Sequence, residues 1–185
     1  MQEQKKTQGH RKLSIRDITL IGMMVAVMEV SKLALSFLPN IELVSFWIIL
    51  FTLFFGWRIL FAIPAFVLIE GLIYGINIWW VSYLYAWPLL AILAGMNRKQ
   101  DSVLFWSTLS GTFGLLFGFL FAIPYVIVGA AGNGLRNGLY AGFTWWIAGI
   151  PYDITHGVGN FVLMLVLYHP VRAAMKQTAR VMMPD

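Results

Sequence analysis

Ionisable side chains inside otherwise apolar segments are the residues of this sequence best placed to do chemistry. They are Glu29, Lys32, Glu70, Asp153 and His156. A charge at the centre of a membrane span costs about 2.5–3.5 kcal/mol on an insertion scale, so each needs a partner or a function. Glu29 and Lys32 share a helical face, which suits either an intrahelical ion pair or contact with a ligand. We expect Glu70 either to meet Lys32 across the bundle or to face a ligand.

A second polar group is formed by Asp153, His156 and Asn160, whose i, i+3, i+7 spacing puts them on one helical face. Gly157 and Gly159 beside them allow another helix to approach closely. Two interpretations remain open. One is a buried hydrogen-bond network that locks this helix to its neighbours, to which Glu29 would also contribute. The other is direct contact with a substrate. We favour the network.

Catalytic chemistry has little support in the sequence. There is no cysteine, and two of the three histidines, His10 and His169, lie in the terminal regions, which leaves one candidate metal ligand. The glycine-rich stretch 129–138 lacks the Gly-Lys-Ser/Thr ending of a phosphate-binding loop. We therefore expect no enzyme activity, no metal and no tightly bound cofactor. A membrane enzyme that uses Asp153 and His156 is the alternative.

The composition requires a membrane. Of the 185 residues 59% are hydrophobic and 11% charged, the mean hydropathy is +0.76, and soluble domains carry about 25% charged residues. A run of about 20 apolar residues crosses the hydrocarbon core. We expect an all-α integral membrane protein with one domain, a six-helix bundle over 13–169 between a basic stretch (1–12) and a carboxyl-terminal segment (170–185). The expected spans are 13–38, 42–56, 59–75, 76–95, 103–129, kinked at Pro124, and 141–168.

The basic residues orient this bundle. The net charge is +5, but eleven of the thirteen Lys and Arg residues lie in the termini and connections of one side, so they indicate a membrane protein and not a nucleic-acid partner. Only Arg136 lies in a connection of the other side, and Lys32 lies within a span. The positive-inside rule predicts a multi-pass protein with both termini in the cytoplasm.

Tryptophan and tyrosine gather toward the outer ends of the predicted spans, beyond what symmetric interfacial belts explain. With Glu42, Glu70, Asn77 and Arg136 nearby, they predict an aromatic-lined outer pocket for a small molecule. We expect the ligand between the outer halves of the first, third, fourth and sixth spans. The expected contacts are Lys32, Glu70, Trp79, Trp80, Tyr83, Tyr85, Trp145 and Trp146.

Two pairs of small residues could allow close helix contact. Gly22 and Ala26 form one such small-xxx-small step in the first span, and Gly114 and Gly118 form another in the fifth. Such steps occur in many bundles, so neither alone identifies a partner.

Several local strings carry a resemblance to a known family. They are 38–44 (LPNIELV), 70–75 (EGLIYG) and 151–161 (PYDITHGVGNF). With the six-helix pattern and the small-residue step in the first span, the chain resembles the substrate-binding S component of energy-coupling-factor (ECF) vitamin transporters. It is most similar to the branch associated with cobalamin.

The resemblance implies a subunit of a bacterial plasma-membrane importer. Such a subunit captures a vitamin from outside, here cobalamin or, as alternatives, riboflavin or pantothenate, and topples in the bilayer to release it inward. A membrane coupling subunit and two ATPase subunits would be its partners, with Gly22 and Ala26 against the coupling subunit. The connections after Leu38, Gly75 and Gly129 would gate the pocket. A structural or assembly protein without a ligand is the third possibility.

Overall fold

The computed structural model describes residues 13–182, and 87% of these residues are helical. The predicted basic stretch 1–12 and the last three residues of the carboxyl-terminal segment lie outside the described residues. The part described contains no strand. Its elements are α1 (Ile15–Ala34), α2 (Val44–Phe55), the 3-10 turn η1 (Gly56–Arg58), α3 (Ile59–Tyr74), α4 (Ile78–Met96), α5 (Val103–Leu115), α6 (Phe117–Asn133) and α7 (Leu135–Met182).

Within residues 13–182, four helical stretches are long and apolar enough to cross a membrane. The first, Val44–Tyr74, contains both α2 and α3; the others are Ile78–Met96, Val103–Asn133 and Leu135–Arg180. The helix α1, with four charged residues, is not among them. The all-α class and several helices able to cross a membrane are thus confirmed, whereas the count of six spans stays a prediction.

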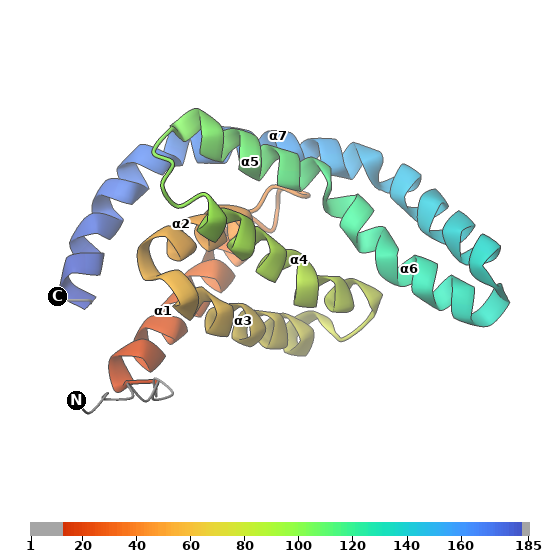
Figure 1. Ribbon diagram of the computed structural model, residues 1–185, viewed down its shortest axis with the longest axis horizontal. Coiled ribbons are helices and arrows are strands. Elements are labelled where there is room, and N and C mark those ends of the chain that lie inside the picture. The colour runs from red at the N-terminus through yellow and green to blue at the C-terminus, as the bar shows by residue number, and fades with distance from the viewer. Residues whose placement is uncertain (1–12, 183–185) are drawn as a thin grey trace, which may run out of the picture.

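The helix α2 forms the centre of the molecule. Nine of its twelve residues are buried, and it packs against α1, α4 and α7. Antiparallel helices α3 and α4 lie to one side, while α5, α6 and α7 form the opposite layer (Figure 1). A short helix whose only polar side chains are Ser45 and Thr52 can occupy this position because little of its surface has to meet water.

Close contact between α5 and α7 depends on glycine. A Cβ on Gly114 would lie 2.8 Å from the Cα of Gly157, and a Cβ on Gly157 would lie 2.5 Å from Leu115. A Cβ on Gly111 would meet Phe161 at 3.0 Å. The predicted close approach at Gly157 is confirmed, and the second small-residue step packs inside this chain.

The fifth predicted span is broken at Leu116, where α5 ends and α6 begins. Pro124 lies within α6, and the kink expected there stays a prediction. The carboxylate of Asp153 on α7 accepts a hydrogen bond from the backbone amide of Gly118, at 2.8 Å. Backbone amides in the first turn of a helix have no carbonyl of the same helix to bind, and the Asp153 carboxylate supplies that acceptor. A residue of α7 therefore stabilises the break between α5 and α6.

The glycine-rich stretch 129–138, expected as an open connection, is almost wholly helical. The helix α6 reaches Asn133 and α7 starts at Leu135, so only Gly134, with φ of +80°, separates them. A Cβ on Gly129 would lie 2.9 Å from the Cα of Gly138. The glycines therefore bring α6 and α7 together in a tight hairpin, seen at one end of the molecule in Figure 1. The expectation of a long loop here was wrong.

The glycine contact predicts a stability difference. Gly114→Ala should lower the free energy of unfolding by about 1–3 kcal/mol, as overpacking of a tight contact does, because its Cβ would meet the backbone of α7. Gly132→Ala is the matched control, since a Cβ there meets nothing within 4 Å. Thermal unfolding of the detergent-purified variants measures both. Equal unfolding temperatures for the two variants would contradict the packing described.

Candidate functional site

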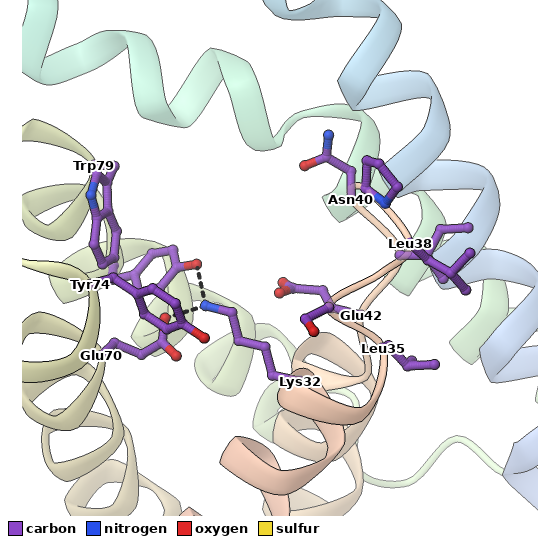
Figure 2. Close-up of a pocket in the computed structure, with 12 residues that line it drawn as sticks. Lys32, Leu35, Leu38, Asn40, Glu42, Glu70, Tyr74 and Trp79 are labelled. Carbon is purple, nitrogen blue, oxygen red and sulfur yellow. Dashed lines mark hydrogen bonds and ion pairs between the residues drawn. The ribbon is translucent and has the colours of Figure 1, made fainter.

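A cavity of about 370 Å³ opens where the carboxyl-terminal ends of α1 and α3 meet the amino-terminal end of α4. The segment 35–43, which connects α1 to α2, forms one of its walls (Figure 2). The residues that line it are Lys32, Leu35, Ser36, Leu38, Pro39, Asn40, Ile41, Glu42, Glu70, Tyr74, Trp79 and Tyr83. The cavity thus combines apolar and aromatic walls with a few polar groups, the usual composition of a small-molecule site.

An ion pair between Lys32 and Glu70 crosses one side of the cavity. The Glu70 side chain is completely buried and that of Lys32 is 20% exposed. Lys32 also donates a hydrogen bond to the Tyr83 hydroxyl, at 3.3 Å. Of the two alternatives for Glu70, the ion pair with Lys32 across the bundle is observed. Glu29 lies beside Glu70 and one of its oxygens, Oε1, is buried without a hydrogen-bond partner.

Aromatic rings surround the Lys32 ammonium. It lies 5.3 Å from the ring centroids of both Tyr74 and Tyr83 and 6.0 Å from that of Phe66. Trp79 meets the Tyr83 ring edge to face at 5.1 Å. Ring faces attract cations at these distances, so this wall of the cavity is suited to positive charge.

The connecting segment 35–43 is irregular but ordered by its own backbone. Hydrogen bonds run from the Leu38 amide to the Leu35 carbonyl (2.9 Å) and from Ile41 to Leu38 (3.3 Å). Asn40 has φ of +55°, a left-handed conformation that asparagine tolerates better than most residues. The turn brings Glu42 into the cavity wall.

Glu42 was noted in the sequence but was not among the expected contacts. Its side chain is 15% exposed, and its Oε1 lies 3.7 Å from Nε2 of His156. The expected set also omitted Leu35, Ser36, Leu38, Pro39, Asn40 and Ile41 of the connecting segment and, on α3, Tyr74. Its position at the end of α3, four residues after Glu70, could have indicated it.

Four of the eight expected contacts line the cavity: Lys32, Glu70, Trp79 and Tyr83. The side chains of Trp80 and Tyr85 do not line the cavity and instead form hydrogen bonds with backbone carbonyls of neighbouring helices. The Trp80 indole donates to the Val67 carbonyl at 2.7 Å, and the Tyr85 hydroxyl donates to the Leu120 carbonyl at 2.6 Å. These two bonds join α4 to α3 and to α6.

Trp145 and Trp146 lie in the α6–α7 hairpin and are not among the residues that line the cavity. Trp145 stacks on Tyr125 with ring centroids 4.7 Å apart. Trp146 contacts Phe119 edge to face at 5.5 Å. Both therefore make contacts between α7 and α6.

The polar group of α7 contacts three neighbouring helices. Asp153 binds the start of α6, as described above. Asn160 donates to the Ser45 hydroxyl of α2 (3.1 Å) and to the Ser110 carbonyl of α5 (3.5 Å). His156 packs edge to face on Phe117, with centroids 4.7 Å apart. The bonds of Asp153 and Asn160 support the network interpretation, whereas Glu29, which was expected to contribute, lies beside Glu70 instead. None of the three α7 residues is among those lining the cavity, although His156 faces Glu42.

The two small-residue steps have different environments. Gly114 and Gly118 face α7, whereas Gly22 and Ala26 lie on an exposed face of α1. A Cβ on Gly22 would meet nothing within 4 Å. The inward face of α1 is instead formed by Leu20, Met24, Val25 and Met28. The Gly22 step is thus open for contact with another molecule in the membrane.

No group of three or more His, Cys, Asp or Glu side chains that could hold a metal ion is found between residues 13 and 182. Comparisons of the chain with models of protein families, with curated proteins and with solved structures find no match.

The ion pair predicts an asymmetric response to mutation. Lys32→Met leaves the Glu70 carboxylate buried without its partner, which should cost about 3–5 kcal/mol. Adding Glu70→Gln removes that charge and should recover part of the loss. Arg172→Met is the control. The ion pair of Arg172 with the exposed Asp101 should contribute only about 0–1 kcal/mol to the free energy of unfolding. Thermal unfolding of the three variants measures this. A double variant as unstable as Lys32→Met would contradict the coupling.

Proposed function

We propose that this chain is the substrate-capturing membrane subunit of an ECF-type vitamin importer in a bacterial plasma membrane. The observation that carries the proposal is the cavity at one end of α1, α3 and α4, which has aromatic walls and a buried ion pair. A cavity of about 370 Å³ falls within the range of about 300–1,000 Å³ found for small-molecule sites. The family resemblance in the sequence supplies the class of ligand.

The membrane topology that we propose has six crossings and both termini in the cytoplasm. Arg58 precedes α3, and Arg98 follows α4, so these basic residues stand at the helix ends opposite the cavity. The positive-inside rule then directs the cavity outward. This is the side from which an importer takes its substrate.

The short helix α2 is compatible with six crossings. Its twelve residues extend only about 18 Å at 1.5 Å per residue, less than the hydrocarbon core of about 30 Å. The irregular segment 35–43 would lie at membrane depth before it. Irregular backbone is tolerated at that depth where it lines a cavity, as this segment does.

Cobalamin remains our proposed ligand, with riboflavin or pantothenate as alternatives. A molecule as large as a corrinoid would enter the cavity only in part and extend from its mouth, whereas the smaller vitamins would be enclosed. The connections after Leu38 and Gly75 border the mouth and would gate it. Energy for transport would come from two ATPase subunits through a membrane coupling subunit. A membrane enzyme is less well supported, because Asp153 is engaged with the Gly118 amide.

The topology is tested by cysteine labelling from outside. Cysteines at Asn40 and Asn133 should react with an impermeant reagent applied to intact cells, and a cysteine at Lys99 should not. The chain has no cysteine of its own to interfere. Labelling at Lys99 alone would reverse the orientation and exclude capture from outside.

The coupling face is tested by bulky replacements on α1. Gly22→Leu and Ala26→Leu should reduce vitamin uptake by cells at least tenfold, because leucine would block close contact with the coupling subunit. Affinity of the purified subunit should stay within about twofold, since the cavity is untouched. Mass spectrometry of the molecule that co-purifies identifies the vitamin to titrate.

Matched controls for these variants lie on α7. Ala148→Leu and Gly149→Leu should leave uptake unchanged, since Ala148 is exposed and a Cβ on Gly149 meets nothing within 4 Å. If Gly22→Leu weakened vitamin affinity as much as uptake, the step would serve folding of the subunit instead. If no vitamin co-purified and none bound, the transporter function would be excluded.

A further inference from the structure

We propose that the cavity binds its substrate through a nitrogen group that donates hydrogen bonds, with a positively charged nitrogen preferred over a neutral one and an anion rejected. The inference names the substrate class for the site described above and therefore rests on the proposed function; among the vitamins named there it disfavours pantothenate, whose carboxylate makes it an anion. Its basis is an excess of unpartnered acceptors and negative charge around the cavity.

The first acceptor is Glu70. Its side chain is completely buried and lines the cavity. One carboxylate oxygen, Oε2, is engaged by Lys32, whereas the other, Oε1, has no donor among the described residues unless the neighbouring Glu29 carboxyl is protonated. A buried carboxylate oxygen without a donor is costly. A donor group on the substrate would remove that cost.

The second acceptor is Glu42, on the opposite wall. Its carboxylate points into the cavity from the connecting segment, toward the side chain of Lys32 (Figure 2). Its ion-pair contact within the protein is with Nε2 of His156 at 3.7 Å, which is too long for a hydrogen bond. Glu42 and Glu70 thus offer acceptors from two sides of the same space.

The charges around the cavity do not balance. Glu42 and Glu70 line it and Glu29 lies beside Glu70, whereas Lys32 is the single cation among the lining residues. Adjacent carboxyls can share one proton. Even with one proton shared by Glu29 and Glu70, Lys32 offsets only one of the two remaining negative charges. A substrate with a positively charged nitrogen would complete the balance.

Lys32 does not make the cavity an anion site. Its ammonium is already bound to Glu70 and to the Tyr83 hydroxyl. A carboxylate ligand would have only the third N–H bond of the ammonium to accept from, and it would then lie near two other carboxylates, Glu70 and Glu42. The faces of Tyr74 and Tyr83, both 5.3 Å from the ammonium, favour positive charge in the same space.

Three probes of one shape test the charge preference. They are 4-fluorobenzamidine, a cation with four N–H bonds, 4-fluorobenzamide, which is neutral, and 4-fluorobenzoate, an anion. Binding to the full chain in lipid nanodiscs is followed by fluorine NMR line broadening. We expect the amidine to bind at least tenfold more tightly than the benzoate, with the amide between them.

Substitutions in the lining test whether the charge preference of the probes comes from this cavity. Glu42→Gln and Glu70→Gln should each reduce the ratio of amidine to benzoate affinity at least fivefold. Asp101→Asn is the control, because it removes a carboxylate that is exposed and far from the cavity. Glu70→Gln removes the partner of Lys32 and could prevent folding, whereas Glu42→Gln leaves that ion pair intact. If Glu70→Gln fails to fold, the charge preference is tested by Glu42→Gln and by the order in which the three probes bind.

Three results would overturn the inference: benzoate binding as tightly as the amidine, no probe binding at all, or a preference unchanged in Glu42→Gln. These are distinguishable from failure of the transporter proposal. A chain that prefers the amidine but neither co-purifies with a vitamin nor binds a coupling subunit would retain this site chemistry and lose the importer function.

Discussion

The ion pair between Lys32 and Glu70 is the interaction on which the site depends. A carboxylate as deeply buried as that of Glu70 is unfavourable unless a cation approaches it, and the cation comes from α1. The pair therefore fixes the end of α1 against α3. Because α1 ends only two residues later, at Ala34, it also fixes where the segment 35–43 begins, and with it one wall of the cavity.

The layer formed by α5, α6 and α7 is held in a different way. Glycines allow its helices to approach closely at Gly114 and Gly157 and at Gly129 and Gly138. Asp153 then binds the amide at the start of α6. This layer joins the rest through Asn160 on Ser45 and Tyr85 on Leu120. The molecule thus combines a cavity wall that carries charged side chains with a layer of helices held together by close backbone contacts and a few hydrogen bonds.

Hydropathy alone predicted the all-helical class and located α2, α3 and α4 within two residues at each end, because apolar runs and their polar breaks are local features. The break at Leu116 was not predictable in this way. It is stabilised by the hydrogen bond from the Gly118 amide to Asp153, a residue 35 positions after Gly118 in the sequence. The stretch 129–138 was misjudged because glycine signals both flexible loops and close helix contact, and only the neighbouring helix decides between them.

The candidate site was predicted in part. The pairing of Lys32 with Glu70 was one of two alternatives. The position of an ionisable residue within a span indicates that it needs a partner, but it does not indicate which residue that partner is. Trp80 and Tyr85 were grouped with Trp79 and Tyr83 because all four lie at similar depth. Helical spacing separates them: Trp79 and Tyr83 are four residues apart on one face, whereas Trp80 and Tyr85 point to α3 and α6.

The length of α7 has a mechanical consequence. Its 48 residues correspond to about 72 Å, more than twice the hydrocarbon thickness of about 30 Å. The helix is not straight: it contains Pro151 and Pro170 and curves toward its carboxyl-terminal end (Figure 1), which carries Arg172, Lys176 and Arg180. Its middle is held to α5 and α2 through Gly157 and Asn160, and Met175 is buried near its basic end. Because one helix is held at both places, the position of its basic end is tied to the packing of the whole molecule.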